Sequence, residues 1–453
     1  RRSSARVISA LHPHESLINR HTPAKMTDFE WKGVMQSVSG STGDLVREVS
    51  PDNPVFVFRP HRVSAAAEWY TTHFPGETYY AVKANPALHI IQALWHGGVR
   101  GFDVASCNEI QLVHSLFPNA KLAFMHPIKN RKVITRAYNE FGVRRFVLDS
   151  PAELSKILAA SNNATDLTLI VRFSVSNYGS SLPLTGKFGA KKEEIAQLLV
   201  DTRLAASSLG VSFHVGSQAL MPAAYEIALS NISQVIASTA PLNGGEEVRV
   251  DIVDVGGGFP SIYDMESPPP LGAYIEAITN SLTSSRVLKD STLWCEPGRA
   301  LSAESESLLT RIEGVKTGTL YLNDGSFGAL YDAVHERWNF PIRAISSNGV
   351  VLSMAPEELV PYTVYGPTCD SADCFPSPVL LPRGLDEGDY LEFGNIGAYG
   401  RSMSTRFNGF GEHDTIQVTD SPWPSLYTPP VEEPALYFTE AAVITVSEEL
   451  ETS

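Results

Sequence analysis

Lys83 stands where an apolar, strand-like segment gives way to a proline turn, within residues 79–86. A lysine at the C-terminal end of a buried strand loses the water around its ammonium group. That desolvation lowers its pKa and makes the amine a nucleophile toward an aldehyde. A surface lysine at a strand end is the alternative interpretation, and the groups that accompany Lys83 decide between the two.

Three further strand-like segments end in polar groups of complementary chemistry. The glycine triplet 256–258 lets backbone N–H groups approach a phosphate, although a tight turn explains the same triplet. Glu296 and Arg299 pair a carboxylate with an arginine suited to phosphate, or form a buried ion pair. His214 and Ser217 offer a ring and a hydroxyl to a flat ligand, although a strand histidine is more often a core residue.

The elements that must position these groups repeat along the chain. Short β-rich segments alternate with helical ones between residues 55 and 299, which is typical of βα units around a parallel sheet. Amphipathic helices are expected at Asn108 to Phe117 and at Lys191 to Ser208. The expected strands are Val55 to Phe58, Tyr79 to Val82, Gly101 to Val104, Leu122 to Met125, Arg145 to Leu148, Leu167 to Phe173, Val211 to Val215, Val248 to Val255 and Leu293 to Cys295.

The predicted fold is α/β, a (β/α)₈ TIM-like barrel followed by a mostly-β domain. Eight or so βα units in about 240 residues match the length of a barrel better than an open Rossmann sheet. The motifs above fall at strand C-termini, where a barrel carries its reactive groups. Beyond residue 299, strands separated by Gly, Pro and Asp turns predict the second domain. They are Leu308 to Ile312, Thr319 to Leu322, Val350 to Ser353, Asp389 to Phe393 and Thr415 to Val418.

The predicted domains are a disordered or transit-like segment at 1–26, a segment at 27–54 that joins the β domain, the barrel at 55–296 and the C-terminal β domain at 297–453. The first 25 residues contain five Arg or Lys and one acidic residue, and Met26 is an alternative start of the folded protein. The proline-rich segment 421–434 predicts an irregular surface loop before a last strand, Ala435 to Phe438.

Composition restricts the possible partners. The 453 residues are 43% hydrophobic and 19% charged, with a formal net charge of −15. That charge opposes binding to nucleic acid or anionic membrane and favours cationic small molecules. Four cysteines without a CxxC pair form neither a disulfide framework nor a recognisable zinc site. We therefore expect a reducing compartment, the cytoplasm, or an organelle if the first 25 residues are a transit peptide.

An amine, an anion, a stacking ring and a phosphate cup are together what pyridoxal 5'-phosphate requires, and no other common cofactor requires all four. From about Phe29 to its C-terminus the chain resembles the barrel-type (fold type III) pyridoxal phosphate-dependent decarboxylases of basic amino acids, the ornithine and lysine decarboxylase family. The resemblance implies that Lys83 bonds to the cofactor aldehyde, Glu296 holds the protonated pyridine nitrogen and His214 stacks on the ring.

The same resemblance assigns the other groups around the cofactor. Asp103, Arg172 and Glu109 match polar positions beside it. The residues that would hold the phosphate are Ser217, Gly257, Gly258, Arg299 and Tyr399.

Substrate groups are implied in the second domain. In the loop 366–373, Cys369 would protonate the carbanion carbon, and Asp370 would bind the distal ammonium of the substrate from across a homodimer interface. Asp324 matches a second carboxylate for that ammonium, from the other subunit, and Phe407 matches an aromatic residue at the pocket wall. Lys187 is expected to pair with Asp373 between subunits.

The implied reaction is decarboxylation of L-ornithine to putrescine, with L-lysine to cadaverine as the nearest variant. One methylene separates the two substrates and is worth only about 1–3 kcal/mol in an apolar pocket. Gln218, Ala300 and the stretch 329–339 depart from the animal ornithine enzymes and suggest the bacterial-type branch, whose members can take both substrates.

Several alternatives are weighed against this assignment. Diaminopimelate decarboxylases carry glutamate where this chain has Asp370, and arginine decarboxylases of this fold are expected to be much longer. Alanine racemases share the barrel plan but pair the pyridine nitrogen with arginine, unlike Glu296. An inactive regulatory homologue would have lost Lys83 or Cys369, and both are present.

Overall fold

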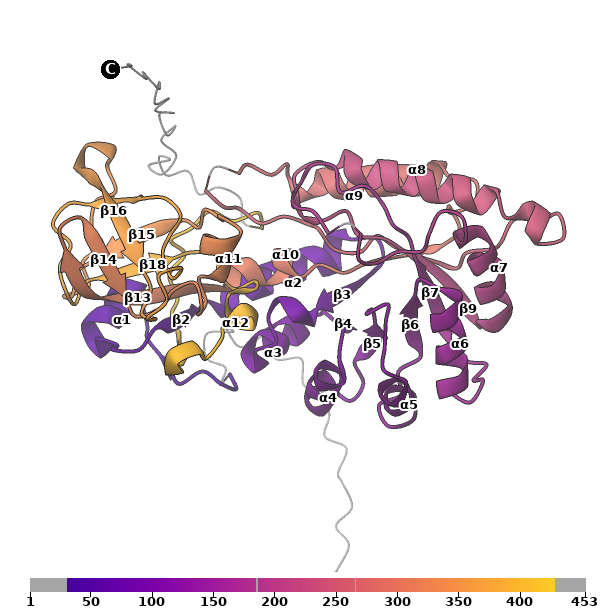
Figure 1. Ribbon diagram of the computed structural model, residues 1–453, viewed down its shortest axis with the longest axis horizontal. Helices are drawn as coiled ribbons and strands as arrows, with labels where there is room; N and C mark the ends of the chain where they lie inside the picture. The colour runs from indigo at the N-terminus through magenta and orange to yellow at the C-terminus, as the bar shows by residue number, and fades with distance from the viewer. Residues whose placement is uncertain (1–30, 185, 265, 428–453) are drawn as a thin grey trace, which may run out of the picture.

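The computed structural model describes residues 31–427, except 185 and 265. The predicted segment 1–26 and the predicted strand Ala435 to Phe438 lie outside these residues. Figure 1 shows two parts side by side, a barrel surrounded by helices on the right and a β-sheet domain on the left. Over the described ranges, no helix combines the length and apolar character needed to cross a bilayer.

The barrel confirms the (β/α)₈ prediction. In the described part of the chain, eight strands, each parallel to its neighbours, close on themselves. They are β3 (Glu77–Ala81), β4 (Gly101–Val104), β5 (Lys121–Phe124), β6 (Arg145–Leu148), β7 (Thr168–Arg172), β9 (Ser208–Ser212), β11 (Ile252–Asp254) and β12 (Thr292–Cys295).

Helices cover the outside of the barrel (Figure 1). Two of them begin at serine N-caps, since Ser106 and Ser150 accept hydrogen bonds from the backbone N–H groups of Glu109 and Glu153. The two predicted helices correspond to α4 and to a shorter α7. The barrel helices are α2 (Pro60–His73), α3 (Leu88–His96), α4 (Cys107–Leu116), α5 (Arg131–Asn139), α6 (Pro151–Ala160), α7 (Ile195–Ala205), α8 (Ala223–Ala237) and α9 (Leu271–Ser284).

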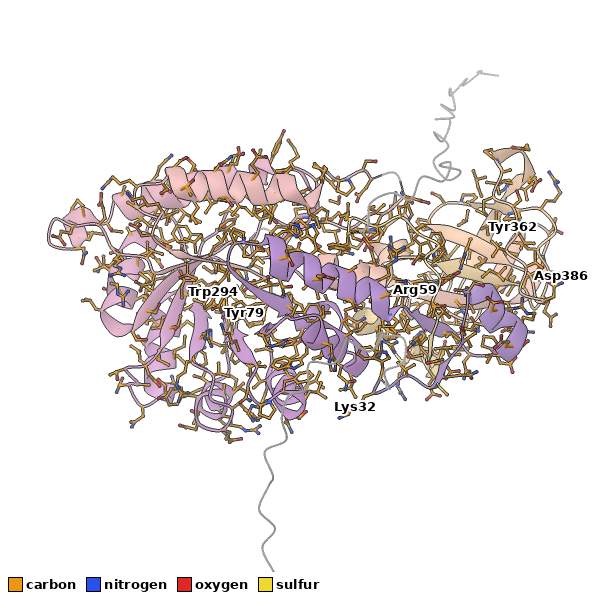
Figure 2. All side chains as sticks on the ribbon, turned by 180° about the vertical axis from the view of Figure 1, so that it is seen from behind. Lys32, Arg59, Tyr79, Trp294, Tyr362 and Asp386 are labelled. Carbon is orange, nitrogen blue, oxygen red and sulfur yellow. The ribbon has the colours of Figure 1, made fainter. Side chains whose placement is uncertain are left out.

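Strand register separates an apolar barrel interior from a polar rim. Tyr79 and Trp294 lie with their ring centroids 4.6 Å apart inside the barrel, where Figure 2 labels them. Two residues beyond Tyr79, Gly101 and Ile252 along their strands, the positions are occupied by Ala81, Asp103 and Asp254. Because parallel strands in register end at the same level, the polar side chains converge on one end of the barrel.

The second part is a sheet of nine strands among the described residues, which we call the β domain. Short helices accompany the sheet, namely α1 (Thr42–Val49), α10 (Arg299–Ser302), α11 (Tyr331–His335) and α12 (Gly400–Met403). A separate hairpin pairs β8 (Ser180–Leu182) with β10 (Ser217–Ala219). The nine strands are β1 (Gln36–Ser37), β2 (Val55–Phe58), β13 (Glu306–Lys316), β14 (Thr319–Leu322), β15 (Ile342–Ile345), β16 (Leu359–Tyr365), β17 (Val379–Pro382), β18 (Tyr390–Phe393) and β19 (Asp414–Gln417).

Two predicted strands are placed differently by the structure. The strand Val55–Phe58 forms, but it pairs with β13 and β19 of the β domain and is no barrel strand. A continuous buried apolar run fits either sheet, so its pattern could not distinguish them. The strand predicted at Val350 to Ser353 is wrong, because there Val351 makes only an isolated bridge to Ile345, at the end of β15.

A buried polar contact joins the two parts next to Lys83. The Asn85 side-chain amide donates to Glu306 Oε2 at 2.8 Å and to the Gly397 carbonyl at 2.7 Å. The Tyr399 backbone N–H donates to the Ala84 carbonyl at 2.7 Å. The β domain is thereby fixed against the turn that carries Lys83.

Candidate active site

A cleft of about 270 Å³, including its open mouth, lies at the C-terminal end of the barrel, where the β domain covers part of it. Most of the predicted cofactor residues meet there. The residues that line it are Ala81, Lys83, His214, Ser217, Gly257, Gly258, Phe259, Glu296, Gly298, Arg299 and Tyr399.

Lys83 follows β3 in a single 3₁₀ turn, Val82–Ala84, and its Nζ lies 2.5 Å from Asp103 Oδ2. The contact follows from register, since Ala81 pairs with Asp103 across β3 and β4. Burial alone would lower the pKa of Lys83, but the charges of Asp103, Tyr399 and Glu296 raise it above its usual value. The prediction of a lowered pKa is therefore wrong for the protein without cofactor, because desolvation is outweighed by an adjacent carboxylate.

Two carboxyl groups share the floor of the cleft. Asp254 Oδ1 accepts the Gly256 N–H at 2.9 Å, and among the described residues its buried Oδ2 has no donor. Burial raises the pKa of Asp254 to about 6, and burial together with the charges of Asp254 and Asp103 raises that of Glu296 well above its usual range. The side chains of Asp254 and Glu296 interact directly. Like charges in contact favour one shared proton, so the pair holds a proton beside the cleft.

His214 presents a neutral ring to the cleft. Its Nδ1 accepts the Gly216 N–H at 3.1 Å, and burial, with the charges of Arg172 and Lys83, lowers its pKa to about 3. A Cβ added at Gly257 would lie 3.0 Å from His214 Nε2. Only glycine at this position leaves the space beside the ring open.

The residues that the sequence predicts to bind the phosphate lie together on one side of the cleft. Arg299 Nε donates to Ser217 Oγ at 3.3 Å, and its guanidinium lies 4.8 Å from the Tyr399 ring centroid. Gly258 has φ +101°, a left-handed conformation that side chains rarely adopt, so it exposes backbone N–H groups in a way another residue would not.

This set fits a flat, phosphate-bearing pyridine. The cleft has an amine at Lys83, a neutral ring at His214 and a cationic, N–H-rich cup beside Arg299. Apart from their shared proton, the carboxyl groups of Asp254 and Glu296 accept only the Gly256 N–H among the described donors, so the floor is short of N–H groups, which a protonated ring nitrogen would supply. The residues present therefore fit pyridoxal phosphate.

Arg172 and Glu109 lie at the edges of this arrangement. Arg172 ends β7, and its charge acts on His214 and Asp254, while its guanidinium lies 5.6 Å from the Phe188 ring centroid. Glu109 accepts the Ala105 N–H at 2.6 Å, and burial raises its pKa.

The predicted groups of the second domain do not line the cleft of the same chain. Cys369 is exposed, and its backbone N–H donates to Asn408 Oδ1 at 3.1 Å. Phe407 is 42% exposed and packs on Phe327 at 4.8 Å between ring centroids. Asp370 is exposed too, and its carboxylate accepts only a local backbone N–H among the described donors. The structure brings the Cys369 and Phe407 loops together on the surface of the β domain.

Two acidic residues are already engaged inside the β domain. Asp324 is 2% exposed and accepts hydrogen bonds from the Gly325 and Ala329 N–H groups and from His413 Nε2. Asp373 is 1% exposed and accepts four hydrogen bonds from the main chain and hydroxyls of Ser326 and Thr368. The expected pairing of Lys187 with Asp373 does not fit this arrangement, because no oxygen of Asp373 is left facing solvent.

The sequence interpretation missed Asp332. It lies on α11 with 9% exposure, and within the described residues its carboxylate has no hydrogen bond or ion pair. Burial raises its pKa, while the charge of Arg299, a cleft residue, opposes that rise. The available signal was an acidic residue within 329–339, the stretch that departs from the animal enzymes.

Comparison with known proteins agrees with this geometry. Residues 61–303 match the family model described as "Pyridoxal-dependent decarboxylase, pyridoxal binding domain". The chain is 31% identical over 378 residues to the lysine/ornithine decarboxylase of Selenomonas ruminantium, covering 82% of this chain and 90% of that protein. It is also 30% identical over 357 residues to antizyme inhibitor 2 of Xenopus laevis, covering 73% of each.

Solved structures share the fold. The arginine decarboxylase of Paramecium bursaria Chlorella virus superposes with a TM-score of 0.72 at 27% identity, over 83% of this chain and 99% of that one. A lysine/ornithine decarboxylase from Vibrio vulnificus, complexed with cadaverine, gives 0.70 at 27% identity, over 83% and 97%. Because the viral protein is matched over nearly its whole length, the expectation that arginine decarboxylases of this fold are much longer is wrong.

Proposed function

Since the chain belongs to the pyridoxal-dependent decarboxylases, we propose that it converts L-ornithine to putrescine and carbon dioxide, with L-lysine as the nearest alternative substrate. It is a carboxy-lyase, and pyridoxal phosphate is its cofactor. The observation that carries the choice of a diamino acid is Asp332, a residue with 9% exposure whose carboxyl group has no partner among the described residues and lies within electrostatic reach of Arg299 at the cleft.

Each cleft residue has a distinct task in this proposal. Bound pyridoxal phosphate supplies an electron sink for the pair left on Cα when carbon dioxide departs. Lys83 is the amine that would bond the cofactor aldehyde, and Asp103, 2.5 Å from its Nζ, holds the ammonium in position. Glu296 would hold the ring nitrogen, and His214 would pack on the ring face. Ser217 and Arg299 would bind the phosphate, together with Gly257, Gly258 and Tyr399.

We assign the distal ammonium of the substrate to Asp332 in place of Asp324. Asp324 already accepts three hydrogen bonds in its own loop, so an ammonium would have to displace one of them. The carboxyl group of Asp332 has no hydrogen-bond partner among the described residues, and burial raises its pKa, so a bound ammonium would favour its charged form. Diaminopimelate carries a second carboxylate at that end, which Asp332 would repel.

We further propose that two copies of the chain share their sites. Cys369, Asp370 and Phe407 are exposed together on the β domain, away from the cleft of their own chain. In a dimer, these residues of one copy would lie at the cleft of the other copy. There Cys369 would protonate the product carbon, and Asp370 would assist Asp332 in binding the ammonium.

A product assay tests the substrate assignment. Purified protein is incubated with ornithine, lysine, arginine or diaminopimelate. We expect the highest kcat/KM with ornithine and lysine, the two differing by about 200-fold or less because one methylene separates them. Faster release of carbon dioxide from arginine or diaminopimelate would contradict the proposal.

Two variants separate the acidic residues. Asp332→Asn should raise KM for ornithine by about tenfold or more, which corresponds to about 1.4 kcal/mol or more of lost ammonium binding. Asp324→Asn should lower the unfolding temperature with a smaller effect on KM. A larger rise in KM for Asp324→Asn than for Asp332→Asn would assign the ammonium site to Asp324.

An inactive regulatory homologue is the second candidate, favoured by the similarity to antizyme inhibitor 2. Lys83 and Cys369 are both present in this chain, which favours the enzyme. Visible absorbance of bound cofactor, lost on Lys83→Ala in a protein that stays folded, is the expected result. Protein purified with pyridoxal phosphate that shows no such absorbance would support the regulatory candidate.

A further inference from the structure

We propose that Gln218 is a positioning residue that holds the phosphate-binding loop of the cleft in its binding conformation. Gln218 is fully buried and lies between Ser217, which lines the cleft, and Ala219. Gln218 itself is not among the described residues that line the cleft. Its effect on the cofactor must therefore pass through its neighbours. The inference rests on the phosphate role proposed above for Ser217, Gly257 and Gly258.

The side-chain amide of Gln218 pairs with both main-chain groups of Ser261. Its Nε2 donates to the Ser261 carbonyl at 2.7 Å, and its Oε1 accepts the Ser261 N–H at 3.0 Å. The Ala219 N–H also donates to the Gly258 carbonyl at 2.8 Å. Two adjacent residues of β10 thus fasten both ends of the segment 258–261, which leaves the glycine triplet little freedom to move away from the cleft.

The backbone of Gln218 is held in an unfavourable conformation. Its φ is +55°, in the left-handed region that residues other than glycine seldom adopt. Such a conformation persists only where surrounding contacts impose it, and it occurs preferentially at functional sites. In this conformation Ser217 reaches Arg299 at the cleft while the amide of the next residue points into the interior toward Ser261.

A carboxylate fixes which way the amide faces. The second hydrogen of Gln218 Nε2 is donated to Glu266 Oε2 at 2.9 Å, and Glu266 Oε1 accepts a hydrogen bond from the Ser181 hydroxyl at 2.6 Å. Both donors and the acceptor of the amide are therefore used. Glutamate at this position would have the same shape, but a carboxylate oxygen would replace Nε2. That oxygen would face two other acceptors, the Ser261 carbonyl and the Glu266 carboxylate.

The experiment compares two probes that differ only in the phosphate. Cofactor is removed from the purified full chain, and the dissociation constants of pyridoxal phosphate and of pyridoxal are measured by absorbance titration. The variants are Gln218→Ala, Gln218→Glu and Gln218→Gly, the last of which relieves the backbone strain and so protects the fold. Gln197→Ala, which removes an exposed glutamine bonded to Asp201 on α7, is the matched control.

We expect each Gln218 variant to bind pyridoxal phosphate at least about tenfold more weakly, with Gln218→Glu the weakest. Binding of pyridoxal should change less than about twofold, and Gln197→Ala should match the wild type for both probes. Equal losses for the two probes, or no loss for either, would overturn the role of Gln218. A wild-type protein that binds both probes equally well would instead refute the proposed phosphate site.

Discussion

At the scale of single residues, Asp103 controls whether Lys83 is ready to react. The carboxylate keeps the amine protonated by raising its pKa, while burial alone would lower that pKa. Only the neutral amine attacks an aldehyde, so capture of the cofactor by the wild-type protein should accelerate as the pH rises into the alkaline range.

Replacing Asp103 with asparagine should change that pH profile. Asp103→Asn removes the neighbouring negative charge, the pKa of Lys83 falls, and the rate of cofactor capture should level off at a lower pH than in the wild type. Stopped-flow absorbance across a pH series measures the rate of cofactor capture. Glu77→Gln, at the other end of β3, is the control. Identical profiles for Asp103→Asn and the wild type would show that Asp103 does not set the charge of Lys83.

Individual residues also show where sequence reasoning reached the site and where it did not. Lys83, His214, Glu296 and Arg299 could be found because each closely follows a recognisable strand and stands near Gly or Pro. Gln218 and Asp254 were not given roles, because their importance lies in contacts with Ser261 and Glu296 that no spacing reveals. Asp332 was missed because no motif marks it, whereas Asp324 stands in a conspicuous Asn-Asp-Gly motif whose side chain is engaged within its own loop.

At the scale of elements, the barrel strands could be predicted because buried parallel strands are short apolar runs between helical segments. Several strands of the β domain, such as β16 and β17, were missed. β16 contains Pro361 and its exposure changes irregularly along the strand, so no simple alternation marks it. The sheet to which Val55–Phe58 belongs depends on partners more than 240 residues away along the chain.

The junction between the elements makes a prediction about cofactor affinity. Asn85→Ala removes a fully buried amide that links Glu306 to the Gly397 carbonyl, next to the contact between Tyr399 and Ala84. We expect a loss of about 2–4 kcal/mol of stability, because two hydrogen bonds are lost and one involves a charged group. Cofactor affinity should fall as Tyr399 shifts. Thermal unfolding measures the stability and cofactor titration measures the affinity, and Asn139→Ala, at an exposed position, is the control. An unchanged cofactor affinity would show that the junction does not influence the cleft.

At the scale of the whole molecule, the proposed sharing of sites predicts complementation. Lys83→Ala and Cys369→Ala, each inactive alone, should recover about a quarter of wild-type activity when their subunits exchange at random. Half of the dimers are then mixed, and each has one intact site.

The control for complementation uses two variants whose changed residues both belong to the barrel side of the cleft. Lys83→Ala mixed with Glu296→Ala should recover nothing, since every mixed dimer then carries one damaged cleft in each subunit. Recovery in this control, or none in the first mixture despite subunit exchange, would mean that the sites are built differently.

A second prediction for the whole molecule concerns acid. Glu392 is fully buried in the β domain, and although burial alone would raise its pKa, Arg343 and Arg59 lower it to about 2, from 4.5. A depressed carboxyl pKa stabilises the fold fully above the ordinary value and loses that contribution as the pH falls toward the folded value. The wild type should therefore lose about 3 kcal/mol between about pH 5 and pH 2 from this group.

Glu392→Gln tests that contribution. The variant should be less stable at pH 7 because Arg59 and Arg343 lose their buried partner, and its stability should fall less steeply below pH 5. Denaturant unfolding across a pH series measures both effects. Glu313→Gln, which removes an exposed partner of Arg311, should behave like the wild type. Parallel pH curves for wild type and Glu392→Gln would assign the acid sensitivity to other groups.

The pairing of β2 with β19 has a consequence for protein synthesis. All strands of the barrel leave the ribosome before residues 414–417, yet the sheet that supplies Tyr399 to the cleft is complete only when Asp414–Gln417 joins Val55–Phe58. A nascent chain thus has its reactive lysine long before it has the whole vitamin-binding pocket. The sheet of the β domain can therefore be completed only after translation has passed residue 417.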